Sequence, residues 1–473
     1  MSADCTVDQL VFQGFGRRRV IACFDGERTS SDGGVVLLRE VEERLGWMKR
    51  FAGCFVDHRR QEWIEHPLET LIRQRIVGLA QGYEDLNDHD ELRSDTLMAL
   101  ASGQADLRGV RRRRVQDRGQ ALAGKSTLNR LELTPADASA ASRYKKIVYD
   151  GEAIERHFVD CFLDAHAEGP PERIVLDLDA TDDPVHGHQE GRFFHGYYGG
   201  YCYLPLYIFC GPWLLAAKLR PSNVDAAAGA VEELARIVGQ IRARWPGVEI
   251  WIRGDSGFAR DAVMAWCEAH DVAYVLGLAR NRRLTAAIGG ALQAARQQQE
   301  ATGRAARVYR ELRYRTRKTW SAERRVVAKA EQHPGKANPR FVVTSLPAQR
   351  FAAQALYETI YCARGDMENR IKEQQLALFA DRTSTATLRA NQLRLWFSAM
   401  AYTLLQALRH FGLQATEMAR AQAGTIRLRL LKIGAVVRLS ARKVWISLSR
   451  AYPLQALFAR VLANLQRAGP RTA

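Results

Sequence analysis

The spacing of apolar residues changes twice along this chain, and in the first part it is typical of helices. Up to about residue 145 apolar residues mostly recur every three or four positions, which predicts helices such as residues 35–45 and the segment that begins at Pro67. In the second of these helices an apolar stripe leaves Arg73 and Arg75 to face outward. We therefore expect a mainly helical N-terminal region over residues 1–145.

From residue 146 strands and helices alternate. The apolar run RIVLDLD ends at Asp179, and the run VEIWIRGD reaches Asp255. Aromatic-rich strands around residues 197–203 and 206–219 and a helix over residues 226–245 lie between these runs, and a helix and the strand VAYVLGL follow. This order is that of a ribonuclease-H-like α/β domain, in which the first strand lies beside the fourth. That arrangement would bring Asp179 and Asp255 together.

Strand-like alternation interrupts this domain, which we place at residues 146–412. Residues 303–348 read as hairpin strands, and nine basic but only two acidic residues lie between Arg304 and Arg325. This predicts a small basic β-strand insertion. In the remaining C-terminal region, residues 413–473, the alternating segment IRLRL predicts a strand, and a last helix is expected from Pro453.

The overall charge indicates a polyanionic partner. The chain has 69 Lys and Arg against 52 Asp and Glu, a formal net charge of +17, and such an excess is typical of proteins that bind nucleic acid. The eight cysteines form no C-x-x-C pair, which fits a reducing cytosol. No apolar run is long enough to span a bilayer, so we expect a cytoplasmic protein without a membrane partner.

One predicted helix collects four functional groups on one side. Tyr361, Arg364, Glu368 and Lys372 follow one another at offsets of three, four and four residues, which places them in one narrow sector of a helix. Such a face suits a phosphate-rich partner. An ordinary surface helix with Arg, Glu and Lys pairs at (i, i+4) is the alternative.

Three carboxylates could form a two-metal site. Asp179, Asp255 and Glu368 lie on a first strand, after a fourth strand and on a later helix. Two Mg2+ ions that activate an attacking oxygen and stabilise a leaving oxygen require hard oxygen ligands of this kind. Asp177 shares a strand face with Asp179 and is the alternative ligand.

These residues carry a resemblance to a known family. From about residue 174 to residue 408 the sequence resembles the DDE transposases of bacterial insertion sequences, in particular the group with a Tyr-x2-Arg-x3-Glu signature followed by Lys. The matching positions are Asp179 in LDLDATDDP, Asp255 in IRGDSGF, and Tyr361, Arg364 and Glu368 with Lys372. The Asp-x-Thr match favours Asp179 over Asp177. A second Lys that the family often has is replaced here by Gln375.

The resemblance implies a metal-dependent enzyme. It would bind the terminal inverted repeats of an insertion sequence, cleave double-stranded DNA at the element ends and join them to target DNA. Asp179, Asp255 and Glu368 would hold two Mg2+ ions, for which Mn2+ can substitute, while Tyr361, Arg364 and Lys372 would contact phosphates. A homodimer on DNA, in the bacterial cytoplasm and associated with the nucleoid, is the expected assembly. A catalytically inactive DNA-binding descendant is the alternative.

Two further segments suggest DNA contacts. Four arginines at residues 111–114 precede Gly119-QALA-Gly124-Lys125-Ser126, which matches the phosphate-loop pattern of ATP-driven enzymes. Because no apolar strand precedes it, we favour a basic segment along DNA in which Arg111, Arg112 and Lys125 contact the backbone. In the insertion, Arg317 and Lys318 would hold DNA while Trp320 stacks on a base, or else Trp320 covers the sheet, as Phe341 is expected to do.

The histidines after the first strand leave two interpretations open. His186, His188 and His195, with Cys202, could bind zinc, but the spacing is not typical of a zinc site. The surrounding segment GRFFHGYYGGYCYLP instead favours an aromatic core layer beside the carboxylates.

Overall fold

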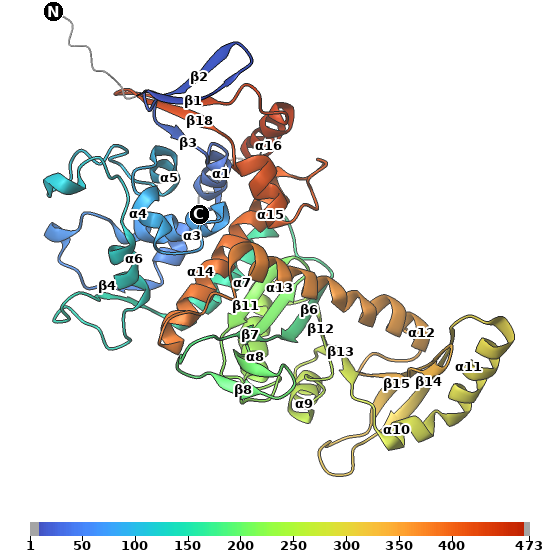
Figure 1. The fold of residues 1–473 in the computed structure, drawn as a ribbon. Helices are drawn as coiled ribbons and strands as arrows, with labels where there is room; N and C mark the ends of the chain where they lie inside the picture. The colour runs from blue at the N-terminus through green and yellow to red at the C-terminus, as the bar shows by residue number, and fades with distance from the viewer. Residues whose placement is uncertain (1–8, 468–473) are drawn as a thin grey trace, which may run out of the picture.

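The computed structural model describes residues 9–467, which form a mixed α/β protein around one large sheet (Figure 1). Its nine strands run in the order β11-β10-β6-β12-β13-β17-β15-β14, with β16 beside β15. The strands of the first half are β6 (Arg173–Ala180), β10 (Leu206–Cys210), β11 (Trp213–Lys218), β12 (Glu249–Gly254) and β13 (Ala273–Leu278). The others are β14 (Ala306–Tyr314), β15 (Arg324–His333), β16 (Lys336–Ala337) and β17 (Arg340–Thr344).

The predicted neighbours in this sheet are confirmed for the first and fourth strands. β6 and β12 are parallel, with Asp177 opposite Arg253. The predicted second strand is wrong: residues 200–203 form β9 in a separate three-stranded sheet. β10 is the antiparallel neighbour of β6, and β11 pairs antiparallel with the other edge of β10. β10 is buried along its length, which the turn at Gly211 and Pro212 allows by folding β11 back onto it.

The insertion prolongs the central sheet instead of forming a sheet of its own. β17 pairs antiparallel with β13, and β15 pairs with both β17 and β14. Two helices, α10 (Arg282–Ala287) and α11 (Gly289–Thr302), precede β14 and lie along the outer strands (Figure 1). The basic insertion is therefore hydrogen-bonded to β13, the strand that follows Asp255 in the chain.

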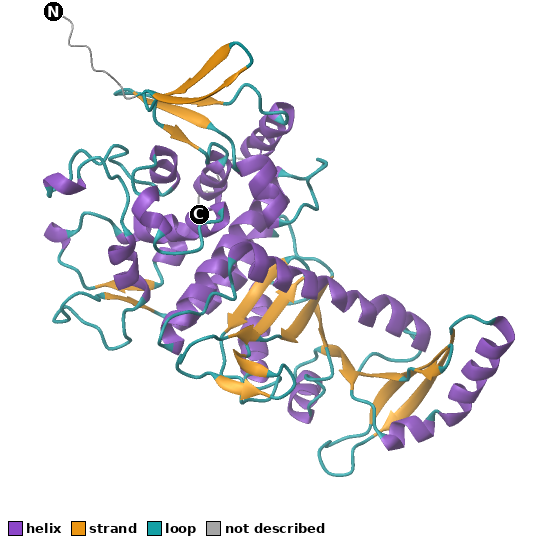
Figure 2. Ribbon diagram, in the orientation of Figure 1, coloured by secondary structure: helices purple, strands orange, loops and turns teal. Residues whose placement is uncertain are grey.

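Helices cover the sheet and continue into the N-terminal region (Figure 2). α14 (Leu388–Ala407) is buried on nearly all sides, as its apolar sequence predicts, and packs on α3 on one side and β11 on the other. The other helices near the sheet are α7 (Gly151–Ala165), α8 (Ala230–Arg244), α9 (Asp261–Ala269), α12 (Ala353–Ala355) and α13 (Gly365–Leu378). The N-terminal helices are α1 (Val35–Leu45), α2 (Trp47–Ala52), α3 (Leu68–Gln81), α4 (Asp88–Leu92), α5 (Thr96–Ala101) and α6 (Lys125–Glu132).

The N-terminal and C-terminal regions interlock. β3 (Thr29–Ser30) pairs with β18 (Ala435–Leu439), which pairs with β19 (Val444–Leu448), and α16 (Gln455–Arg467) packs on α1. The strand expected for IRLRL is wrong, because this segment continues α15 (Ala423–Ile426) as a turn of π-helix. There the Arg427 guanidinium donates to the carbonyls of Leu79 and Ala80 at the end of α3.

The expected outward direction of Arg75 is also wrong. Its Nε donates to Glu132 at 2.7 Å, and Arg394 of α14 donates to the same carboxylate at 2.7 Å. Burial acts to raise the pKa of Glu132, but the two guanidiniums outweigh it and the pKa is lowered. A buried ion triad thus links α3, α6 and the central helix α14.

Shorter strands complete the described chain. They are β1 (Leu10–Phe15), β2 (Arg18–Ala22), β4 (Phe55–Asp57), β5 (Ile147–Tyr149), β7 (Asp183–Pro184), β8 (Phe193–His195) and β9 (Gly200–Tyr203). Within residues 9–467 we find no helix with the length and apolarity needed to cross a bilayer.

Candidate active site

Three carboxylates from separate elements line one cavity of about 530 Å³. Asp179 lies near the end of β6, and Asp255 directly follows β12, whose parallel register with β6 continues to place them side by side. Glu368 lies in the first turn of α13. Lys372, one turn further along α13, lines the same cavity. The strand order thus explains how residues 76 positions apart meet.

Asp179 is the most constrained of the three carboxylates. Its side chain is only 15% exposed, and the nearest cation, Nη1 of Arg364, is 3.9 Å away. Burial raises the pKa of Asp179 to about 6; Arg364 opposes this rise, whereas Asp255 and Glu368 add to it. The site therefore concentrates more negative charge than its own arginine balances.

Asp177 is held in a different way. Arg253 donates to both of its carboxylate oxygens, at 2.5 and 2.8 Å, and both side chains are buried. The same guanidinium donates to the carbonyl of Ile360 at 2.6 Å. Asp177 therefore orients Arg253, which holds the segment before Tyr361 against β12. Asp177 is not among the residues that line the carboxylate cavity.

The donor set suits a hard divalent cation. Asp179, Asp255 and Glu368 offer only oxygen ligands, the type that Mg2+ and Mn2+ prefer. Between residues 9 and 467, however, no three Asp, Glu, His or Cys side chains stand close enough together to share an ion. Arg364 lies between Asp179 and Glu368, and its Nη2 is 2.5 Å from the Glu368 carboxylate. A guanidinium thus partly balances the charge that a metal would otherwise balance.

The signature helix is not one regular α-helix as predicted. The backbone forms a π-helical turn, η3 (Leu356–Tyr361), then a 3-10 turn, η4 (Cys362–Arg364), and only then α13. Tyr361 lies before this change of pitch and lines a different cavity from Arg364, Glu368 and Lys372. Local π-helical turns of this kind are frequent at functional sites.

Tyr361 lines a neighbouring cavity of about 510 Å³, which shares Asp255 and Ser256 with the first. The cavity is flanked by the basic residues Arg280, Lys336 and Arg340. Gly277 of β13 makes room for the phenol, since a Cβ there would lie 2.5 Å from the Tyr361 hydroxyl. Sequence reasoning missed this glycine and these three cations; the basic character of the insertion was a signal for Lys336 and Arg340 but not for Arg280.

The loop between β14 and β15 contains the other predicted DNA contacts. Arg317 and Lys318 are exposed at its tip. Trp320, in contrast, is 5% exposed and packs edge-on against Tyr314 at a centroid distance of 5.6 Å. Its ring is not presented to a base, so of the two interpretations the structural one applies, as it does for the buried Phe341.

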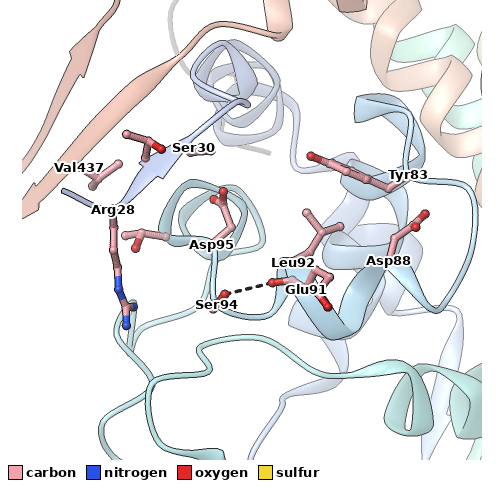
Figure 3. A pocket seen from close by; sticks show the side chains of 11 residues that line it. Arg28, Ser30, Tyr83, Asp88, Glu91, Leu92, Ser94, Asp95 and Val437 are labelled. Carbon is pink, nitrogen blue, oxygen red and sulfur yellow. Dashed lines mark hydrogen bonds between the residues drawn. The ribbon is translucent and has the colours of Figure 1, made fainter. Parts of the chain in front are cut away.

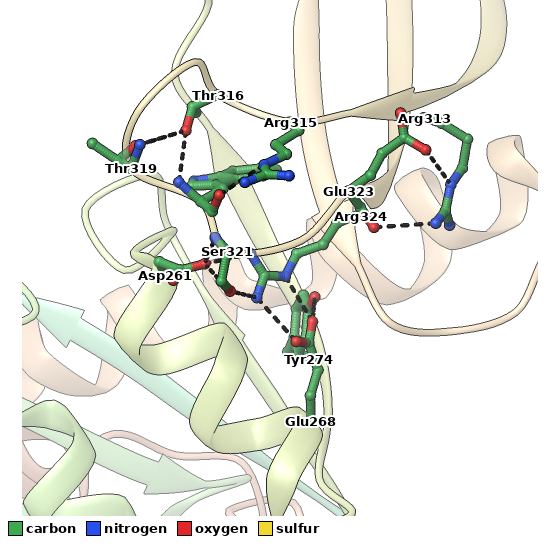
Figure 4. Close-up of polar contacts among 11 residues, drawn as sticks. Asp261, Glu268, Tyr274, Arg313, Arg315, Thr316, Thr319, Ser321, Glu323 and Arg324 are labelled. Carbon is green, nitrogen blue, oxygen red and sulfur yellow. Dashed lines mark hydrogen bonds and ion pairs between the residues drawn. The ribbon is translucent and has the colours of Figure 1, made fainter.

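An ion-pair network anchors this loop to α9 (Figure 4). Arg324, 3% exposed, donates to Asp261 at 2.6 Å and to both oxygens of Glu268 at 2.7 and 2.9 Å. Ser321 also donates to Asp261, through its hydroxyl at 3.0 Å. Because α9 begins six residues after Asp255, the insertion loop is tied to the same side of the sheet as the carboxylates.

The arginine segment of the N-terminal region is less available than predicted. Arg112 is buried and donates to the carbonyls of Glu65 and Gln120 at 2.8 Å, so it cannot contact DNA in this arrangement. Arg111 is exposed. Lys125 is half-exposed and lies 3.4 Å from the Asp90 carboxylate.

The phosphate-loop pattern is not supported by its surroundings. A 3-10 turn, η2 (Val115–Asp117), precedes it where a buried strand is needed, and the helix α6 that follows has only eight residues. The ATP-dependent alternative therefore loses its structural basis.

The histidine segment is also unlike both expectations. His186, His188, His195 and Cys202 belong to no three-residue metal group among residues 9–467, and Nδ1 of His188 lies 2.7 Å from Arg192. The predicted aromatic core layer is wrong, because five rings of this segment are exposed and Tyr203 is its one buried aromatic residue.

A separate cavity of about 580 Å³ lies between α4, α5 and the β3–β18 sheet (Figure 3). Asp95, which lines it, accepts from the backbone N–H groups of Leu97 and Met98 and so caps α5. This carboxylate therefore has a structural role at the start of α5.

Comparison with known families defines the class. In this protein a large mixed sheet carries a cavity that is lined by three carboxylates, an arginine and a lysine. Residues 12–470 match the family described as transposase DDE domain group 1, and the chain belongs to this family of DDE transposases. No curated protein matches the chain.

Proposed function

We propose that the chain is the transposase of an insertion sequence, which binds the terminal inverted repeats and catalyses metal-dependent cleavage and strand transfer. The observation that carries this proposal is the convergence of Asp179, Asp255 and Glu368 on one cavity. Membership of the DDE transposase family supports it. We infer that the sheet from β11 to β13 is the core of a ribonuclease-H-like catalytic domain over residues 146–412.

The carboxylates would hold two Mg2+ or Mn2+ ions, which when bound activate a water or a 3′ hydroxyl and stabilise the leaving oxygen. Arg364 must turn away from Asp179 and Glu368 for this to happen, because its guanidinium lies between them. A DNA phosphate is the natural new partner for it. Metal binding and DNA binding are then coupled through one side chain.

The remaining cations would position the DNA. Lys372 faces the carboxylate cavity, and Arg280, Lys336 and Arg340 flank the adjoining cavity with Tyr361. We assign phosphate contacts to these residues and to the exposed Arg317, Lys318 and Arg111. Residues 1–145 and 413–473 would recognise the element ends, and a homodimer would hold two ends together in the bacterial cytoplasm.

The test is incubation of the purified chain with Mg2+ and DNA that carries the ends of its own element. We expect strand breaks at the element boundary, and joined products when target DNA is added, with no reaction in EDTA. Binding without cleavage, in Mg2+ and in Mn2+, would instead identify an inactive DNA-binding descendant.

A further inference from the structure

An exposed aromatic hairpin stands at the mouth of the carboxylate cavity. β8 and β9 pair antiparallel, with Phe194 opposite Tyr201, and are joined by the turn Gly196-Tyr197-Tyr198-Gly199. Five rings on this hairpin are exposed, and Tyr197 and Phe194 are the most exposed at 86% and 59%. The five are Phe193, Phe194, Tyr197, Tyr198 and Tyr201. We call these five side chains the aromatic platform.

The platform is ordered by contacts among its own rings. Phe194 and Tyr201 pack edge-on at a centroid distance of 5.7 Å, and Tyr197 and Tyr198 at 5.0 Å. His195 lies against Tyr198 at 4.9 Å. Isolated exposed apolar side chains need no explanation, but several exposed rings gathered on one hairpin mark a candidate binding surface.

The position of the platform relates it to the carboxylates. Tyr197 and Tyr198 line the same cavity as Asp179, Asp255 and Glu368. The Tyr198 hydroxyl is 3.5 Å from the carbonyl of Ala180, the residue after Asp179. A DNA strand whose phosphate enters the cavity would therefore pass Tyr197 and Tyr198.

The charge of the hairpin suits a polyanion. Residues 191–204 contain no Asp or Glu, and the Arg192 guanidinium lies over the Tyr201 ring at 4.4 Å. Lys372 and Arg364 line the cavity beside it. Aromatic faces interleaved with cations are the means by which proteins hold unpaired bases without regard to sequence. An apolar protein partner would use the rings but would gain nothing from this charge or from the adjoining catalytic carboxylates.

We propose that the aromatic platform is a stacking site for unpaired bases of the DNA end, beside the phosphate that is cleaved. This inference rests on the proposed function and adds a subsite to it. The rings of Tyr197 and Phe194 receive bases, while Arg192 and Lys372 neutralise the backbone on either side. Stacking of one base typically corresponds to a tenfold to hundredfold gain in affinity, roughly.

The experiment compares two DNA ends without metal, so that no cleavage occurs. One end is fully paired, and the other carries a few unpaired bases that include the fluorescent base 2-aminopurine at the terminus. The full chain should bind the unpaired end about tenfold or more tightly and should quench the fluorophore. Tyr197→Ala with Phe194→Ala should abolish both the preference and the quenching, whereas Tyr197→Phe, which keeps a ring, should retain them.

Tyr144→Ala is the matched control, because Tyr144 is similarly exposed but does not line the cavity. It should behave as the unaltered chain. Equal binding of both ends by the unaltered chain, or unchanged preference and quenching in the double variant, would overturn the proposal. So would a double variant that alters only self-association, which would make the platform an interface between copies. Failure to cleave element ends in Mg2+, with the binding preference intact, would refute the proposed function and not the stacking site.

Discussion

Two aspartates on one face of β6 show how the same side chain is put to opposite uses. Asp177 faces Arg253 across the parallel register and is paired at both oxygens. Asp179, two residues on, meets Asp255 where the same register continues, and its closest cation is 3.9 Å away. The first carboxylate is satisfied and holds the fold together. The Asp179 carboxylate lies near two other carboxylates, and a bound metal ion would balance this negative charge.

The largest expected effect separates these two roles by activity. Asp179→Ala, Asp255→Ala and Glu368→Ala should each lower strand cleavage on the order of a thousandfold or more, because each removes one of the proposed oxygen ligands. Binding to end DNA should stay near that of the unaltered chain, since phosphate contacts remain. Cleavage gels and gel-shift titrations measure the two quantities, and a variant that still cleaves would take its residue out of the site.

The next effect distinguishes Asp177 from Asp179 by the stability of the folded chain. Asp177→Ala leaves Arg253 buried without its carboxylate and should lower the free energy of unfolding by about 3–5 kcal/mol. Urea unfolding measures this loss. The double variant Asp177→Leu with Arg253→Met, which removes both charges, should recover much of the stability. If Asp177→Ala is instead fully stable and inactive, the roles of the two aspartates are exchanged.

A pH-dependent effect should follow from the raised pKa of Asp179. The folded value is about 6, against about 4 in the unfolded chain. Between these values the folded chain holds the proton more tightly, so this residue's stabilising contribution is complete below pH 4 and is lost as the pH rises through 6.

Asp179→Asn should therefore stabilise the metal-free chain above pH 6 by up to about 3 kcal/mol and leave its stability unchanged below pH 4. Urea unfolding in EDTA across this range measures the difference. A variant that is less stable than the unaltered chain at pH 8 would show that Arg364 fully balances the charge of Asp179.

The smallest effect concerns the cations of α13. Arg364→Ala and Lys372→Ala should each reduce the salt dependence of DNA binding by roughly one unit of slope. Only Arg364→Ala should also tighten Mn2+ binding without DNA, because only Arg364 lies between two of the carboxylates. Equal Mn2+ affinity in the two variants would argue against coupling through Arg364.

The sequence could predict what short-range rules decide. Helix α1 has the expected bounds, and the strand order was enough to bring Asp179 and Asp255 together, because parallel neighbours end at the same edge of a sheet. The turn of the chain at Tyr361 could not be foreseen, because no glycine or proline marks the π-helical segment before it.

Long-range partners explain the other differences. The sequence around Arg112 and Trp320 does not reveal whether these side chains are exposed or buried. Their burial depends on their partners, which are the carbonyl of Glu65 for Arg112 and the ring of Tyr314 for Trp320. The insertion joined the central sheet because β13 offered a free edge to β17. Conversely, the rings around Tyr197 are exposed because no element of residues 9–467 covers their hairpin, which the apolar sequence of the hairpin alone does not reveal.

The most direct test is to count Mn2+ ions bound by the chain on a DNA end that cannot be cleaved, using electron paramagnetic resonance. We expect two ions per active site in the unaltered chain, and the loss of one or both in Asp179→Ala and in Asp255→Ala. The same number of bound ions in all three proteins would contradict the assignment of these aspartates as metal ligands.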